Sequence, residues 1–192
     1  MTTATIPDWT AQGVLPPVDL LDPTSANRSP YQASVTDFVL RFASSNERCQ
    51  IIDGLLRYRA ALKEAGLTRG FQWVDGSFLE EVETLESRPP NDIDVVTFFQ
   101  LPAGKTQTDI AAKHADLVDH DQVRTKYHVD AYLVHLGSDS ERLVRQSSYW
   151  YSVWSHRRNL AWKGFVEIDL DDIHDPNARA LLEIYSINGD RP

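Results

Sequence analysis

The sequence predicts one α/β domain of the α+β kind, in which a mixed β-sheet is flanked by helices. Residues 71–75, 91–99 and 127–134 are rich in β-branched and aromatic residues, which is typical of strands. Between them lie segments whose apolar residues recur at helical spacing. With 192 residues, the chain is long enough to bury a sizeable core within a single domain.

The charge balance and the cysteine count exclude some classes of function. The chain has 28 acidic and 19 basic residues, which gives a net charge of −9. Nucleic-acid binding depends on neutralising phosphates, so this balance argues against a broad nucleic-acid surface, although not against a local basic site. The single cysteine, Cys49, excludes an intrachain disulfide and a multi-cysteine metal site, and its apolar context predicts a core thiol.

The N-terminal region is expected to be an extended strap. Half of the ten prolines fall within residues 1–30, where they disfavour a continuous helix or strand. We therefore divide the chain into a proline-rich strap, residues 1–34, and a domain, residues 35–192. The apolar stretch GVLPP favours a strap that lies on the body, the alternative being a loose tail. No secretory signal and no run of ~20 apolar residues is present, which predicts a cytoplasmic protein without membrane contact.

Two helices are expected before the first strand. A short helix over residues 35–43 has apolar residues at helical spacing. Ser44 and Glu47 form a capping-box pattern at the start of a longer helix, which ends near Gly66. Its apolar stripe is expected to pack on the sheet, with Arg59 on the mostly outward face and no role beyond support.

Four further elements are expected after the second strand. They are a helix from Thr106 or Thr108 to about Arg124, a helix from Ser138 or Ser140 to His156, a strand over residues 163–170, and a helix over residues 177–185 capped by Asp175.

Three aspartates are the candidate reactive groups. Side chains alternate along a strand, so Asp92 and Asp94 point to the same face. Asp130 lies within the later strand, and if the two strands are neighbours, the three carboxylates crowd one site. Such crowding raises pKa values and costs stability unless a cation is bound. Mg²⁺, which binds carboxylate and phosphate oxygens together, is the expected cation.

Gly76 and Ser77 follow the first strand and form the second candidate feature. Glycine allows a ligand to approach the backbone closely. Exposed N–H groups and a serine hydroxyl at such a corner can bind phosphate oxygens. The pair therefore predicts a phosphate-binding corner beside the carboxylates.

A Gly-Ser corner after a strand, an Asp-x-Asp pair in a second strand and a lone Asp in a third together resemble the signature of the polymerase-β-type nucleotidyltransferase superfamily. The segment 78–91, which separates Ser77 from Asp92, is slightly longer than is usual there. The stretches GVLPP, FQWVDGSF, RPPNDIDVV, YWYSVWSHRR and KGFVEIDL also resemble an uncharacterised bacterial and phage family of small nucleotidyltransferase-like proteins.

The resemblance implies a fold, an activity and a set of ligands. Residues 35–192 would form a nucleotidyltransferase-like domain that moves a nucleotidyl group from an NTP such as ATP to a hydroxyl or phosphate acceptor, releasing pyrophosphate. Asp92, Asp94 and Asp130 would bind two Mg²⁺ or Mn²⁺ ions, and Asp130 would help to deprotonate the acceptor. Gly76 and Ser77 would hold the NTP phosphates. Whether the acceptor is a nucleic acid, a protein or a small molecule stays open.

Two features near the predicted site have competing interpretations. Arg142, Arg145 and Tyr149 fall on one stripe of the helix that ends at His156, where they could bind the triphosphate and base of the nucleotide or form a solvated face. His128 is expected to share a strand face with Asp130, either as a ligand or second-sphere partner, or as an ordinary strand histidine.

Three other classes of function remain open. An inactive nucleotidyltransferase fold could serve as a binding or regulatory protein, such as an antitoxin or a partner in a two-gene defence system. A two-metal nuclease could use the acids, although it has no triphosphate for the Gly76-Ser77 corner to hold. A metal-free structural protein is the last alternative.

Overall fold

The sheet of this protein has five strands in the order β1-β5-β2-β3-β4. A computed structural model describes residues 6–171 and 173–188. The strands are β1 (Tyr31–Ala33), β2 (Gly70–Asp75), β3 (Ile93–Phe99), β4 (Val129–His135) and β5 (Val166–Asp169). β2 runs antiparallel to β3 and β5, whereas β3 pairs with β4, and β1 with β5, in parallel. The predicted mixed sheet is confirmed, but β1 was not predicted.

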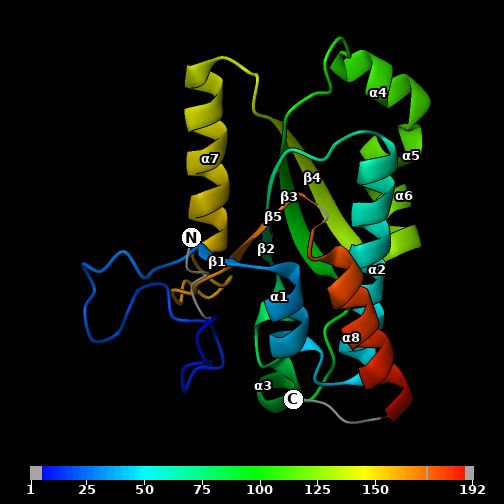
Figure 1. The fold of residues 1–192 in the computed structure, drawn as a ribbon. Coiled ribbons are helices and arrows are strands. Elements are labelled where there is room, and N and C mark those ends of the chain that lie inside the picture. Colours follow the sequence, from blue (N-terminus) through cyan, green and yellow to red (C-terminus); the bar gives the residue numbers. More distant parts are fainter. Residues whose placement is uncertain (1–5, 172, 189–192) are drawn as a thin grey trace.

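Helices cover both faces of the sheet, and their bounds follow chain order. They are α1 (Val35–Phe42), α2 (Asn46–Glu64), α3 (Val82–Glu86), α4 (Gln107–Lys113), α5 (Ala115–Val118), α6 (His120–Tyr127), α7 (Ser140–Trp154) and α8 (Asp175–Asn188), with a 3₁₀ turn at Ser77–Leu79. Figure 1 shows α7 alone on one side of the sheet, with α2, α6 and α8 on the other. The predicted sheet flanked by helices is therefore present.

Helix α2 packs its apolar face against the sheet, but the sequence-based prediction for one of its arginines was wrong. Arg59 was expected to point outward, yet it is 3% exposed. Its guanidinium donates to Gln72 Oε1 at 2.7 Å and to Asp175 Oδ1 at 2.7 Å. Because both acceptors lie far away in the sequence, no local pattern could indicate that this arginine links α2 to β2 and α8.

Several helix ends differ from the predicted ones. The expected helix from Thr106 to Arg124 is broken into α4, α5 and α6, with breaks at His114 and Asp119. Thr106 does begin α4, through a capping box with Asp109. The N-cap of α2 is Ser45 instead of Ser44. The N-cap of α7 is Asp139, which lies between the two predicted serines.

The N-terminal segment lies against the body from its apolar stretch onward. Val14 and Leu15 are 3% and 1% exposed. Leu15 O accepts a hydrogen bond from Gly164 N at 2.7 Å, and Pro16 O accepts one from the Tyr31 hydroxyl at 2.8 Å. This is the arrangement expected for a strap, although residues 1–5 of the predicted segment lie outside the described residues. Residues 31–33, also assigned to the strap, form β1 within the sheet.

Two other expectations concern the core and the membrane. Cys49 is buried near the N-terminal end of α2, as predicted for a core thiol. In the described parts of the chain, no helix combines the length and the apolar character needed to span a bilayer.

Candidate functional site

Strand pairing places three carboxylates next to one another on the face covered by α7. Asp94 of β3 is the register partner of Asp75 on β2 and also of Asp130 on β4. Register partners on adjacent strands point to the same face, so these three side chains form a row across the sheet. Asp92 lies two residues before Asp94 and joins the row from the chain that leads into β3. The structure thus brings the three predicted acids together and adds a fourth.

Crowding has a clear electrostatic effect on Asp94. Burial, followed by the charges of Asp75, Asp130 and Asp92, raises the pKa of Asp94 to about 7. An ordinary aspartate has a pKa near 4, so the folded protein holds a proton at this site far more tightly than a free carboxyl does. The site therefore favours any ligand that brings positive charge to Asp94.

Asp75 and its partner Lys163 were missed by the sequence analysis. Lys163 Nζ lies 3.0 Å from Asp75 Oδ1 and 3.1 Å from Glu80 Oε1, and all three side chains are buried. Burial raises the pKa of Asp75 to about 6 although Lys163 opposes the shift. Burial alone lowers the pKa of Lys163, but Asp75 and Glu80 outweigh it and raise that pKa.

The sequence contained a signal that Asp75 belongs to the site. Asp75 ends the strand just before Gly76, and strand alternation puts its side chain on the same face as that of Trp73. Lys163 gave no comparable signal, because its neighbours in space come from the other end of the chain.

Helix α6 supplies one basic side chain, an arginine or a histidine, to each of the two outer carboxylates. Arg124 NH2 lies 2.6 Å from Asp92 Oδ2, and His120 Nε2 lies 3.2 Å from Asp130 Oδ1. Burial and the neighbouring charge of Asp130 raise the pKa of the Tyr132 hydroxyl. From the sequence, this segment was predicted only to be part of a helix that leads to the third strand. Its contribution to the site becomes visible only in the tertiary structure.

These contacts determine how the site fits a metal ion. Among residues 6–171 and 173–188, no group of three or more histidine, cysteine, aspartate or glutamate side chains is arranged to hold a metal. Asp92 and Asp130 lie against Arg124 and His120 of α6. The donor chemistry nevertheless fits Mg²⁺ or Mn²⁺, which prefer carboxylate oxygens. Asp130 Oδ1 is buried, and its neighbour within 4 Å on α6 is His120 Nε2 at 3.2 Å.

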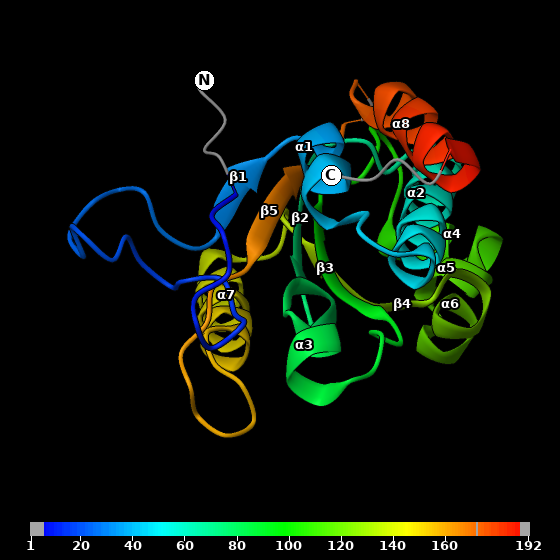
Figure 2. The same cartoon turned by 90° about the horizontal axis from the view of Figure 1, so that it is seen from below.

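The corner after β2 is shaped by Gly76. Its φ of +89° lies in the region that favours glycine, and a Cβ there would meet Asp94 Oδ2 at 2.5 Å. Ser77 begins the short 3₁₀ turn, which Arg48 braces by donating to Phe78 O at 2.6 Å and to Glu80 O at 2.7 Å. Figure 2 shows the chain continuing from this corner into α3, which lies beside the ends of β2 and β3. The backbone at the corner therefore comes directly against the central carboxylate.

This geometry predicts that Gly76→Ala will perturb the acidic site as well as the stability. Gly104→Ala is a matched control, because Gly104 has φ +73° but nothing lies within 4 Å of its Cβ position. We expect Gly104→Ala to cost about 1 kcal/mol of unfolding free energy and Gly76→Ala to cost at least about 2 kcal/mol more. Urea denaturation of both variants measures the difference. Equal losses would show that Asp94 gives way freely at the corner.

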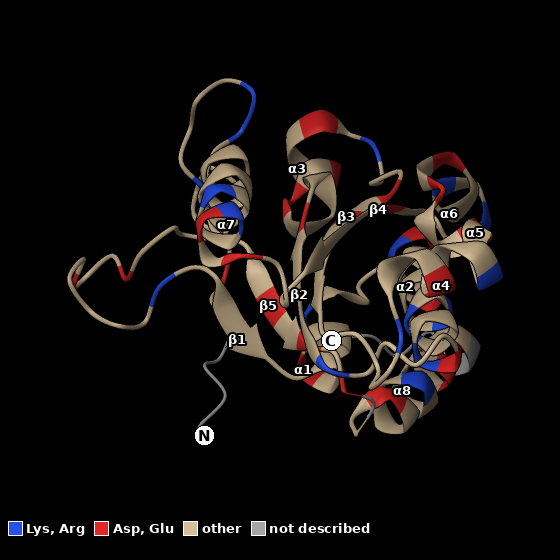
Figure 3. Cartoon of the chain, turned by 90° about the horizontal axis from the view of Figure 1, so that it is seen from above, with Lys and Arg blue, Asp and Glu red and all other residues tan. Residues whose placement is uncertain are grey.

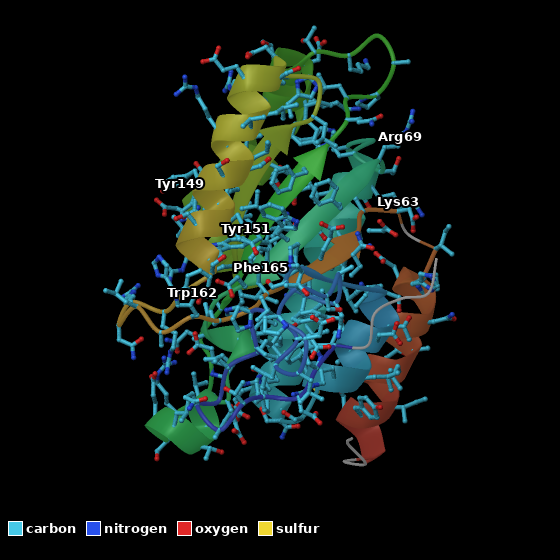
Figure 4. All side chains as sticks on the ribbon, turned by 90° about the vertical axis from the view of Figure 1, so that its left-hand side faces the viewer. Lys63, Arg69, Tyr149, Tyr151, Trp162 and Phe165 are labelled. Atoms are coloured by element: carbon cyan, nitrogen blue, oxygen red, sulfur yellow. The ribbon has the colours of Figure 1, made fainter. Side chains whose placement is uncertain are left out.

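The three predicted nucleotide-binding residues of α7 lie in different surroundings. Arg142 lines a cavity beside β4. Arg145 is exposed and paired with Glu141 at 2.6 Å. Tyr149 is 59% exposed, and its ring lies 5.1 Å from that of Trp150. In Figure 4, Tyr149 and Tyr151 lie on opposite sides of α7, with Tyr151 on the side of Phe165. Their role in nucleotide binding stays a prediction.

His128 does not occupy the expected position. It ends α6 with φ +57°, and β4 begins only at Val129, so His128 does not share a strand face with Asp130. Instead it lines a polar pocket between α2 and α8, together with Arg57 and Arg179. The prediction failed because α6 extends up to the start of β4. His128, in a left-handed backbone conformation, ends the helix and is not part of the strand.

A cavity near the acids runs along the edge of the sheet at β4. It has a volume of about 570 Å³ and is bounded by β4, by α7 and by the α4–α6 segment. His120 and Tyr132, which contact Asp130, also line this cavity. The acidic site therefore adjoins a cavity of the size that small molecules occupy.

The surface charge agrees with the composition. Figure 3 shows lysine and arginine positions interspersed with acidic ones over α6, α7 and α8. Within the described residues this mixture gives little support to a broad nucleic-acid surface.

Comparisons with known proteins add a family but no activity. Residues 7–169 match the model of a family described as "Family of unknown function (DUF6932)". The comparisons with curated proteins and with solved structures gave no match. The matched range includes all four aspartates of the site, the Gly76-Ser77 corner and Lys163.

Proposed function

We propose that this chain, which belongs to the DUF6932 family, transfers a nucleotidyl group from an NTP to a hydroxyl acceptor in a reaction that depends on Mg²⁺ or Mn²⁺. The observation that carries the proposal is the row of Asp75, Asp94 and Asp130 on three adjacent strands, directly beside the Gly76 corner. A row of carboxylates next to a glycine corner suits a ligand that combines phosphates with cations.

In the proposed reaction the acceptor oxygen attacks the α-phosphorus of the NTP. The bond from that phosphorus to the bridging oxygen breaks, and pyrophosphate leaves. Asp130 takes the proton of the acceptor hydroxyl, and Gly76 and Ser77 hold the phosphates. Divalent ions held by Asp92, Asp94 and Asp130 would neutralise the charge of the phosphates and of the leaving group. The protein itself contributes mainly positioning and a preorganised charge distribution.

Asp130 is equipped for such a role by its neighbours. His120 Nε2 lies 3.2 Å from Asp130 Oδ1, so a proton received by Asp130 has an imidazole ring within reach. His120 also lines the β4 cavity, through which an acceptor could reach the carboxylate. These contacts favour Asp130 over Asp92 as the base, because Asp92 is held by the permanently charged Arg124.

The direct test is a labelling experiment. The purified protein is incubated with each α-labelled NTP, with Mg²⁺ or Mn²⁺, and with a cell extract as the source of acceptors. We expect one NTP to transfer label to a molecule of the extract and to release unlabelled pyrophosphate, and chelation by EDTA to stop both. Absence of labelling with every NTP and both metals would contradict the proposal.

A second candidate function is nucleotide binding without transfer. It is favoured by the ion pair of Arg124 with Asp92, which places one of the protein's own cations on a carboxylate of the site. Such a protein would act as a regulator, for instance as one partner in a two-gene system. Calorimetry with NTP and Mg²⁺ would then show saturable binding, while the labelling experiment would yield no product.

A further inference from the structure

The cavity along β4 has a distinct polar character at its end near the start of α7. Arg142 lines this end and is exposed. One helical turn later, Gln146 lines the same cavity, and its Oε1 is buried without a hydrogen-bond partner. A buried acceptor without a donor is costly, at roughly 1–3 kcal/mol, and a ligand N–H or O–H would relieve it. The pair would suit a ligand head that combines an acidic group with a neighbouring donor.

The opposite end of the cavity lies beside two neighbours of the proposed catalytic carboxylate. His120 and Tyr132 line it there, and the side chains of both lie next to Asp130. The walls between the two ends include Ile110, Leu117 and Leu133, which are apolar. A molecule lying in the cavity would therefore meet an apolar surface in its middle and, at one end, the two side chains that adjoin Asp130.

The packing of α7 on β4 gives the approximate length of such a molecule. The ring of Trp150 lies 4.5 Å from that of Tyr132, which marks the Asp130 end. Arg142 lies eight residues before Trp150, or about 12 Å along the helix axis at 1.5 Å per residue. Figure 1 shows α7 descending beside β4 from the short connection between them, which is the direction that this estimate requires.

We infer that the β4 cavity binds the acceptor of the proposed reaction, and that this acceptor is an elongated small molecule with a hydroxyl at one end, an apolar middle, and an acidic group beside an N–H or O–H donor at the other. Its hydroxyl lies at Asp130, its acidic group at Arg142 and its donor at Gln146 Oε1. The inference rests on the proposed function for the acceptor role, but the ligand site itself is defined by the cavity.

Binding of a synthetic probe tests the site independently of catalysis. N-(8-hydroxyoctanoyl)glycine carries a hydroxyl, an alkyl chain, an amide N–H and a carboxylate in the required order. Its N-methylglycine analogue lacks only the N–H, and 1-decanol lacks the whole acidic head. Saturation-transfer NMR and calorimetry measure binding to the wild-type protein, to a cavity-filling variant, Ala111→Phe, and to its matched control, Ala112→Phe. Ala111 lines the cavity, whereas its exposed neighbour on α4 does not.

We expect the glycine probe to bind the wild type and the Ala112→Phe variant equally, and Ala111→Phe to weaken binding at least tenfold. Arg142→Gln should weaken binding of the glycine probe about tenfold and leave 1-decanol unaffected, as expected for loss of a charged hydrogen bond. The N-methyl analogue should bind more weakly to the wild type, and Gln146→Leu should remove this difference. Circular dichroism verifies that each variant is folded.

The outcomes separate this inference from the proposed function. Absence of probe binding, or equal loss in Ala111→Phe and Ala112→Phe, overturns the ligand site even if label transfer to an extract component is observed. Displacement of the probe by ATP without metal would assign the cavity to the nucleotide and overturn the acceptor role. The acceptor role is also overturned if the protein binds the probe and transfers label to another acceptor, but never transfers label to an alcohol of the probe's kind. Probe binding without transfer from any NTP refutes the proposed function, while the ligand site stands.

Discussion

Asp94→Asn is expected to stabilise the folded protein while abolishing nucleotidyl transfer. Burial and three neighbouring carboxylates raise the pKa of Asp94 to about 7. Because the folded pKa lies above the unfolded one, the folded state is penalised once the carboxyl ionises, and stability falls as pH rises from about 4 to about 7. Asparagine removes the charge but keeps the shape. We expect a gain on the order of 2 kcal/mol at pH 8, after allowance for solvent screening, and little gain at pH 4.

The measurement is urea denaturation of the wild type and the variant at pH 4, 6 and 8, together with the labelling assay. Asp121→Asn, a change of an exposed carboxyl on α6, is the control and should alter stability by less than about 0.5 kcal/mol. A loss of stability at pH 8 would mean that Asp94 is held by favourable interactions instead of being strained by its neighbours. Unchanged transfer by the variant would reject Asp94 as part of the catalytic site.

Lys163→Met is expected to cause the largest loss of stability. It leaves Asp75 and Glu80 buried, with Asp75 lacking its cation, and breaking a buried ion pair from one side costs about 3–5 kcal/mol. Glu80 keeps the guanidinium of Arg157 at 2.8 Å, so most of the penalty belongs to Asp75. The pKa of Asp75 is already raised to about 6 with Lys163 present and rises further without it. The loss should therefore be greatest above pH 7 and diminish toward pH 5, where Asp75 binds a proton.

Denaturation at pH 5 and pH 8 measures this dependence. The matched control is Lys126→Met, which removes an exposed lysine paired with Asp116 at 3.0 Å and should cost under about 1 kcal/mol. Adding Asp75→Asn to Lys163→Met should recover most of the lost stability, because it removes the unpaired charge. A loss that is independent of pH, and that the double variant retains, would assign the role of Lys163 to packing of its alkyl chain.

The sequence predicted the elements whose signals are local. Strand alternation gave β2, β3 and β4 and the shared face of Asp92 and Asp94, and the capping pattern at Thr106 correctly began α4. The sheet class followed from these. Glycine followed by serine after a strand also indicated a sharp corner, which the φ of Gly76 bears out.

What the sequence could not predict depends on contacts between distant segments. Lys163 reaches Asp75 across the sheet, and Arg59 reaches Asp175 from α2, and neither pairing leaves a mark on the neighbouring residues. The error at His128 has another origin, since the chain runs from helix to strand through a single left-handed residue. The sequence did not predict the roles of Arg124 and His120 of α6, because their acidic partners become neighbours only when β3 and β4 pair.

The position of β5 has a consequence for synthesis of the protein on the ribosome. β5 lies between β1 and β2, although it follows all the other strands in the chain. A nascent chain that has emerged only as far as β4 therefore has a gap in its sheet and lacks the ammonium group for Asp75. Such a chain cannot complete its sheet, and we expect it to remain susceptible to proteases until residues 163–169 leave the exit tunnel.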